Sequence, residues 1–301
     1  MARGFAWGAA LAAAIAATCG CACAFAQDKA LAQHDALAQQ NAPARSDSTV
    51  TAPACGGEPI ADTTVSRIRD GRTFTLADGR VVRLAAVEVP PLPMPGASGG
   101  IVPGAKAAEA ALEALAGGDR VVLRRAEAGP DRYGRVVAYA YTERDGDEIF
   151  VQGELITAGY ARVGDRVAGR ACATALLGRE SAARRAKLGL WADPHYDPVD
   201  AESPAAVLAQ RGQFALVEGT VVSVRESGPT LYVNFGQRWS EDFSVTVRKR
   251  NERSFADAGL NLRGLEGRRV IVRGFVEARG MHKMPSIEAE RPEQIETADR
   301  D

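Results

Sequence analysis

Short apolar and β-branched runs, separated by turns rich in glycine, proline and aspartate, dominate the chain from about residue 57. Such runs are typical of strands, and Ala77-Asp78-Gly79-Arg80 between two of them is typical of a tight hairpin turn. The strands predicted in the first half of the chain are residues 64–68, 73–76, 81–87, 121–125 and 136–142.

A different spacing predicts helices between and after these strands. Residues 105–116 carry alanine and leucine at helical intervals and end at Gly117-Gly118, which is a helix stop signal. Two further helices are predicted at 151–158 and at about 171–187. This half is therefore mainly β with an inserted helix and terminal helices.

A second unit follows a proline-bearing linker at residues 192–204. A short helical piece is predicted around 252–258. The predicted strands of this unit, within 205–297, are residues 214–224, 230–235, 243–247, 269–276 and 286–289. The fold class predicted for the chain is accordingly α+β, mainly β with helices.

The N-terminus has the features of a secretory signal peptide. Arg3 precedes an uncharged alanine-rich run, and Ala24-Phe25-Ala26 places small residues at a cleavage site, so residues 1–26 are predicted to be removed. The run is too short to span a bilayer, and a lipoprotein cysteine in it is the other alternative. Residues 27–56, polar and repetitive, are predicted to be a flexible leader. We expect an exported protein, periplasmic or secreted.

Export also bears on the cysteines. Three of the five cysteines lie within residues 1–26, so the mature chain keeps Cys55 and Cys172. An even pair in an oxidising compartment usually bonds, and we expect these two to form a disulfide. The alternative is two unrelated buried thiols.

Three separated segments resemble the core of the staphylococcal nuclease-like (thermonuclease) family. They are Asp70-Gly71-Arg72-Thr73-Phe74-Thr75-Leu76, Val82-Arg83-Leu84-Ala85-Ala86-Val87-Glu88-Val89-Pro90-Pro91 and Asp131-Arg132-Tyr133-Gly134-Arg135. The resemblance implies a five-stranded OB-type barrel over residues 57–191. It also implies phosphodiester cleavage by two arginines, calcium-binding carboxylates and a glutamate base.

Only part of that chemistry is present in the sequence. Arg83 and Arg135 stand at the positions of the two catalytic arginines. Asp70 and Glu88 stand at metal-ligand positions, and Glu88 is also a candidate catalytic acid. The principal calcium carboxylate, however, is replaced by Arg72, and the general base by Pro91. We therefore expect no cofactor, and calcium only if the protein is an enzyme with a rearranged acid set.

The same substitutions suggest another site. Arg72, Arg83 and Arg135 together would form a three-arginine pocket that holds phosphate without cutting it. The competing interpretation is that Arg72 pairs with Glu88 and the barrel is a scaffold.

The second unit resembles bacterial OB-type nucleic-acid-binding modules in residues 231–236 and 272–274, which predicts two five-stranded barrels in tandem. Arg248-Lys249-Arg250, with Arg253, Tyr232 and Trp239, offers the charge and aromatic groups that single-strand binders use. The alternative is a solvated basic turn.

These observations predict an exported thermonuclease-like protein without metal-dependent catalysis that binds nucleic acid or another polyanion. The alternatives are an active calcium-dependent nuclease and a protein-interaction module of the envelope. The formal net charge of −1 neither requires nor excludes a nucleic-acid partner. With only three scattered histidines, a histidine-based metal cluster is excluded. The oligomeric state is not predicted.

Overall fold

The structure, a computed structural model, describes residues 55–93, 102–238, 240–279 and 284–297. These residues belong to one compact unit. The predicted signal peptide (1–26), nearly all of the predicted leader (27–56) and Trp239 lie outside the described residues. Among the helices that are described, none is long and apolar enough to cross a membrane.

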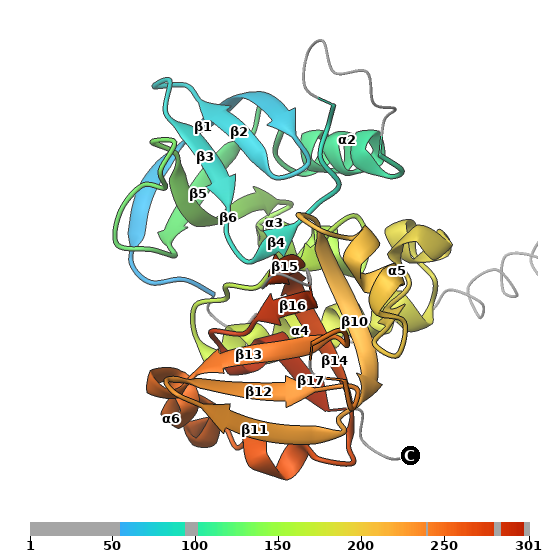
Figure 1. The fold of residues 1–301 in the computed structure, drawn as a ribbon. Coiled ribbons are helices and arrows are strands. Elements are labelled where there is room, and N and C mark those ends of the chain that lie inside the picture. Colours follow the sequence, from blue (N-terminus) through green and yellow to red (C-terminus); the bar gives the residue numbers. More distant parts are fainter. Residues whose placement is uncertain (1–54, 94–101, 239, 280–283, 298–301) are drawn as a thin grey trace, which may run out of the picture. The chain divides into compact units, whose positions relative to one another are not determined.

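The N-terminal half contains a closed barrel of five strands (Figure 1). Antiparallel pairing joins β3 to β2, β2 to β1, β1 to β5 and β5 to β6, and a parallel pairing of β3 with β6 closes the ring. A sixth strand, β7 (Asp147–Phe150), pairs antiparallel with β6 outside the ring. The barrel strands are β1 (Pro59–Asp70), β2 (Thr73–Leu76), β3 (Val81–Leu84), β5 (Arg120–Arg125) and β6 (Val136–Arg144). The predicted barrel is thus confirmed.

Helix α2 (Ala105–Ala116) packs against β1 at the turn that leads into β2. A Cβ on Gly71 would lie 2.6 Å from the Cβ of Ala108, so only glycine allows this approach. Gly71 lies between Asp70 and Arg72. The close contact of Gly71 with α2 therefore fixes the backbone position of both neighbouring residues.

Helices α3 (Val151–Thr157) and α4 (Arg170–Arg185) follow the barrel and pack on each other. The predicted disulfide is confirmed: Cys55, just before β1, is bonded to Cys172 on α4, with 5.1 Å between the Cα atoms. Short strands β4 (Val87–Glu88) and β8 (Arg162–Val163) pair with each other between these elements. The sequence prediction had treated 81–87 as a single strand; Ala86, at φ 62°, lies in the break between β3 and β4.

The segment predicted to be a linker contains ordered structure. It follows η1 (Gly189–Ala192) and includes η2 (Pro194–Tyr196) and β9 (Val199–Asp200), and α5 (Pro204–Ala209) begins at its end. Trp191 and Tyr196 are buried in one apolar cluster with Phe214 and Leu216 of the following strand. The segment therefore packs against the C-terminal residues.

The C-terminal residues form two sheets rather than a second closed barrel, so that prediction is wrong (Figure 1). One sheet has the order β17-β14-β10-β9, and the other has the order β11-β12-β13-β16-β15. Parallel β9 occupies one edge of the β10–β14 pair and β17 the other, so neither edge is left to pair with the five-stranded sheet.

The bounds of these elements explain the error. Residues 214–224 had been predicted as one strand, but the chain divides there between the two sheets. The elements are β10 (Phe214–Thr220), β11 (Ser223–Ser227), β12 (Thr230–Asn234), β13 (Ser244–Arg248), α6 (Lys249–Asp257), η3 (Leu262–Leu265), β14 (Arg269–Phe275), β15 (Glu277–Arg279), β16 (Met284–Glu288), η4 (Pro292–Gln294) and β17 (Ile295–Thr297).

A buried ion pair ties α4 to the four-stranded sheet. Arg273 on β14 and Glu180 on α4 are 0% and 1% exposed, and the two nitrogens of the guanidinium each lie 3.0 Å from a carboxylate oxygen. Arg273 also pairs with Glu296 and donates to the Val163 carbonyl at 3.0 Å. Burial acts to lower the pKa of Arg273, but the two carboxylates outweigh it and raise that pKa.

Candidate functional site

Arg72, Arg83 and Glu88 meet at the end of the barrel. The pairing of Thr73 with Arg83 places Arg72 beside β3, where the Leu84 amide donates to its carbonyl at 2.8 Å. Arg72 forms an ion pair with Glu88, and Arg83 Nη2 lies 3.0 Å from Glu88 Oε1. Glu88 is buried, and its one carboxylate pairs with both guanidinium groups.

This arrangement affects the charge of Arg83. Burial lowers its pKa, and the neighbouring Arg72 lowers it further, while Glu88 acts in the opposite direction. Arginine remains charged at any ordinary pH, so Arg83 stays a cation. Its side chain is 28% exposed, against 8% for Glu88. Arg83 therefore keeps a face toward solvent, whereas the carboxylate does not.

Asp70 has a local structural role. Its Oδ1 accepts a hydrogen bond from the Arg72 backbone amide at 2.8 Å, which is the contact of an aspartate that shapes a tight turn. Asp70 is therefore close to Arg72 in the chain, but its side chain contacts the backbone of the turn.

Arg135 is held by a turn of its own. Its Nε lies 2.7 Å from Asp131 Oδ2, and Asp131 Oδ1 accepts from the backbone amides of Tyr133 and Arg135 at 2.9 and 3.0 Å. Burial would raise the pKa of Asp131, but these hydrogen bonds outweigh it and lower that pKa. The guanidinium carbons of Arg132 and Arg135 lie 4.8 and 5.0 Å from the centre of the Tyr133 ring.

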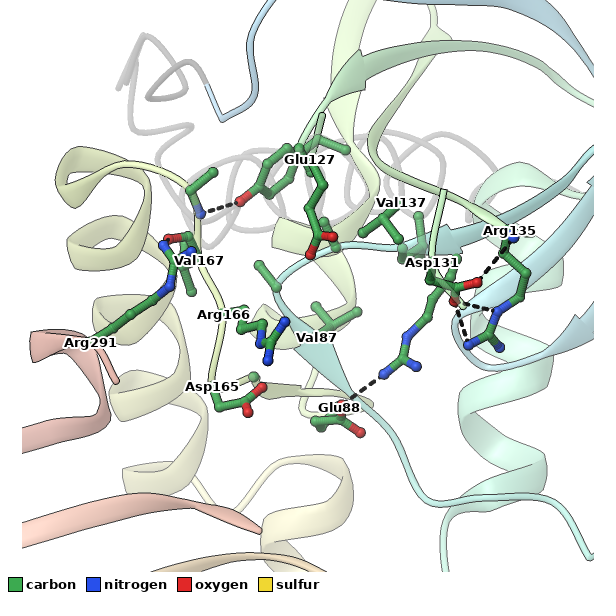
Figure 2. A pocket seen from close by; sticks show the side chains of 18 of the residues that line it. Val87, Glu88, Glu127, Asp131, Arg135, Val137, Asp165, Arg166, Val167 and Arg291 are labelled. Carbon is green, nitrogen blue, oxygen red and sulfur yellow. Dashed lines mark hydrogen bonds and ion pairs between the residues drawn. The ribbon is translucent and has the colours of Figure 1, made fainter. Parts of the chain in front are cut away.

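The Arg83–Glu88 pair and the Asp131–Arg135 pair line a cavity of about 610 Å³. Arg83, Glu88, Asp131 and Arg135 line it, and Figure 2 shows Glu88 and the Asp131–Arg135 pair on neighbouring walls. Arg72 and Asp70 do not line it. Pro91, which takes the place of the general base, is exposed and is not among the lining residues.

Several lining residues were missed by the sequence analysis. Glu127, Asp165 and Arg166 come from the segments that follow β5 and β8, and Phe275 and Arg291 come from the C-terminal residues. Burial raises the pKa of Asp165, and the nearby charge of Glu88 raises it further. No short motif marks these five positions, because the segments that carry them meet only in the folded chain.

Calcium does not fit the residues present. The Arg72 guanidinium stands against Glu88, and a cation at that carboxylate would be repelled by Arg72 and Arg83 together. Within the part of the chain that the structure describes, no group of three or more aspartate, glutamate, histidine or cysteine side chains is arranged to hold a metal ion. We therefore derive no metal-dependent step.

The comparison with known families agrees with the barrel. Residues 81–193 match the family described as Staphylococcal nuclease homologue. This segment is a staphylococcal nuclease-like domain. The match includes Arg83, Glu88, Asp131 and Arg135, and begins after Asp70 and Arg72. A search of curated proteins finds no match.

Calcium binding offers a direct test of Arg72. We expect the parent protein to show no saturable calcium binding by titration calorimetry. Arg72→Asp removes one of the two cations at Glu88 and adds a second carboxylate, and we expect it to bind calcium with a Kd of about 10⁻⁴–10⁻³ M, as in weak extracellular sites.

Arg69→Asp is the matched control, because Arg69 is exposed on β1, three residues before Arg72, and its Nε contacts Thr75 rather than Glu88. It makes the same change in charge and should leave calcium unbound. Tight calcium binding by the parent would contradict this account of Arg72.

Proposed function

We propose that this protein is exported and that its nuclease-like domain binds nucleic acid through the phosphodiester backbone without metal-dependent cleavage. The observation that carries the proposal is the Arg72–Glu88–Arg83 cluster. It places a guanidinium where the family resemblance expects a calcium ligand, while Arg83 and Arg135 remain on the cavity wall.

The charges around the cavity support phosphate as the bound group. Five arginines line it against four acidic residues, and a guanidinium can bind two phosphate oxygens at once. The arginines are Arg83, Arg132, Arg135, Arg166 and Arg291, and the acids are Glu88, Glu127, Asp131 and Asp165. Asp131 orients Arg135 through its Nε and leaves the side chain 22% exposed. A phosphate bound at this wall would replace Asp131 as the partner of some of the Arg135 nitrogens.

Tyr133 gives the cavity a second kind of contact. Tyr133 is 65% exposed, unusual for a large aromatic residue, and its ring lies near the guanidinium groups of Arg132 and Arg135. Single-strand-binding proteins combine arginines on the backbone with exposed aromatic rings on which bases stack. This combination favours nucleic acid over a simple phosphorylated polymer such as polyphosphate.

The test combines binding and cleavage on one labelled single-stranded oligonucleotide. We expect fluorescence anisotropy to show binding that weakens with salt, and gels to show no cleavage with calcium or with EDTA. Arg135→Ala should weaken binding about tenfold and reduce the slope of log K against log salt by about 1.

Arg120→Ala is the matched control, because Arg120 also pairs with an aspartate, Asp62, but does not line the cavity. It should bind as the parent does. Calcium-dependent cleavage that disappears in Arg135→Ala would establish the enzyme instead. Absence of any binding would overturn the proposal and favour a protein-interaction module.

A further inference from the structure

The C-terminal residues supply one wall of the cavity. Phe275, the last residue of β14, lines it and is 43% exposed, and the centre of its ring lies 5.6 Å from that of Phe214 in an edge-on arrangement. Arg291 reaches across from the segment before η4, and its Nη1 donates to the Val167 carbonyl at 3.1 Å (Figure 2). The cavity is therefore completed by residues outside the nuclease-like domain.

A second cavity adjoins the first. It has a volume of about 650 Å³, and Val167 and Arg291 line both cavities. Arg170, at the start of α4, and Arg250, at the start of α6, line the second cavity only. Val167 and Arg291 therefore form the boundary between the two cavities, which together we call the path from the nuclease-like domain to α6.

Three acids line the second cavity, and two of them lie near an arginine that is outside it. Glu290 lies 3.7 Å from Arg166, and Asp257 lies 3.8 Å from Arg253. Glu293 is partly buried, and burial raises its pKa. These pairings reduce the negative charge that a polyanion in the second cavity would meet.

Three arginines that line the second cavity, Arg170, Arg250 and Arg291, have no carboxylate partner among the described residues. Arg170 donates to the Asp257 carbonyl at 3.4 Å and Arg291 to the Val167 carbonyl. In the described residues no carboxylate forms an ion pair with Arg170, Arg250 or Arg291. Arg248 and Lys249, which precede Arg250, instead pair with Glu288 and Glu226. Of the predicted basic run, Arg250 is therefore the member that faces the path.

We propose that a single strand of nucleic acid continues from the first cavity past Phe275 and Arg291 into the second, where Arg170 and Arg250 contact its phosphates. Phe275 stacks on an unpaired base, which a double helix would not offer. The C-terminal unit then sets the length of strand that is bound. This inference rests on the proposed function, and its test separates the two.

The test compares oligothymidylates of 4 and 16 nucleotides by fluorescence anisotropy. The parent should bind the longer strand more tightly. Arg250→Ala should weaken binding of the 16-mer about five- to tenfold, lower its salt slope by about 0.7, and leave the 4-mer unchanged. Arg225→Ala, an exposed arginine that lines neither cavity, should change neither.

Phe275 is tested with strands that lack bases. Phe275→Leu keeps an apolar group against Phe214 and should weaken the 16-mer about tenfold, while Phe275→Tyr should bind as the parent does. Neither should affect an abasic strand of the same length. Val222→Ala, at another exposed apolar position, is the control.

The outcomes are distinct. Equal effects of Arg250→Ala on both lengths, or no effect on either, would overturn the path while leaving the first cavity as a binding site. Equal loss on normal and abasic strands in Phe275→Leu would overturn the stacking. If the parent binds neither strand, the proposed function itself fails.

Discussion

Replacing both cysteines, in Cys55→Ala/Cys172→Ala, is expected to lower the free energy of unfolding by about 4–5 kcal/mol. The disulfide joins residues 117 apart in sequence, and a cross-link over so long a loop removes much of the entropy of the unfolded chain. Urea unfolding followed by tryptophan fluorescence measures the difference. Thiol titration of the denatured, unreduced parent should detect no free thiol.

The position of the disulfide explains why its loss should destabilise the whole barrel. Both cysteines are buried, and the Cys55 carbonyl accepts a hydrogen bond from the Tyr141 hydroxyl on β6 at 2.8 Å. The bond fixes the segment that enters β1 to helix α4. Reduction of the parent should destabilise it by the same amount as the double substitution, and two free thiols in the purified, unreduced protein would contradict the prediction.

The second large effect is expected at the buried ion pair. Glu180→Gln should lower the free energy of unfolding by about 3–5 kcal/mol, because it leaves the Arg273 cation buried with only Glu296 as a charged partner. Val163 also loses a charged acceptor, since its amide donates to Glu180 Oε2 at 2.5 Å. Urea unfolding of parent and variant measures the difference.

A surface pair gives the matched control. Glu218→Gln breaks the pair with Arg269, whose side chain is 60% exposed, and should cost less than about 1 kcal/mol. The apolar replacement Arg273→Met/Glu180→Leu should recover much of the stability that Glu180→Gln loses, because no buried charge is then left unpaired. A cost below about 1 kcal/mol for Glu180→Gln would show that water reaches the pair.

Local patterns were enough to predict much of the nuclease-like barrel. β2 and α2 have the predicted bounds, residues 73–76 and 105–116, because alternation and helical spacing are properties of a few neighbouring residues. The sequence predicts the disulfide from the two cysteines that follow the predicted signal peptide, and the disulfide is confirmed. The motifs likewise placed Arg83, Glu88 and Arg135 near one another, and all three line one cavity.

Long-range pairing could not be predicted in the same way. The closed second barrel was wrong because β9 and β17, short strands that the sequence did not indicate, take both edges of the β10–β14 pair. A strand of two or three residues carries almost no periodic signal. Its pairing depends on residues distant in the chain that happen to supply a free edge.

The same division applies to the site. The sequence by itself determined which residues replace the family's acids, since Arg72 and Pro91 are read directly from it. Only the tertiary structure decided that Glu88 takes both Arg72 and Arg83, and that Phe275 and Arg291 complete the cavity from the other end of the chain. The physical reason is that an ion pair or a cavity wall depends on distance in space and on burial, which strand and turn patterns do not specify.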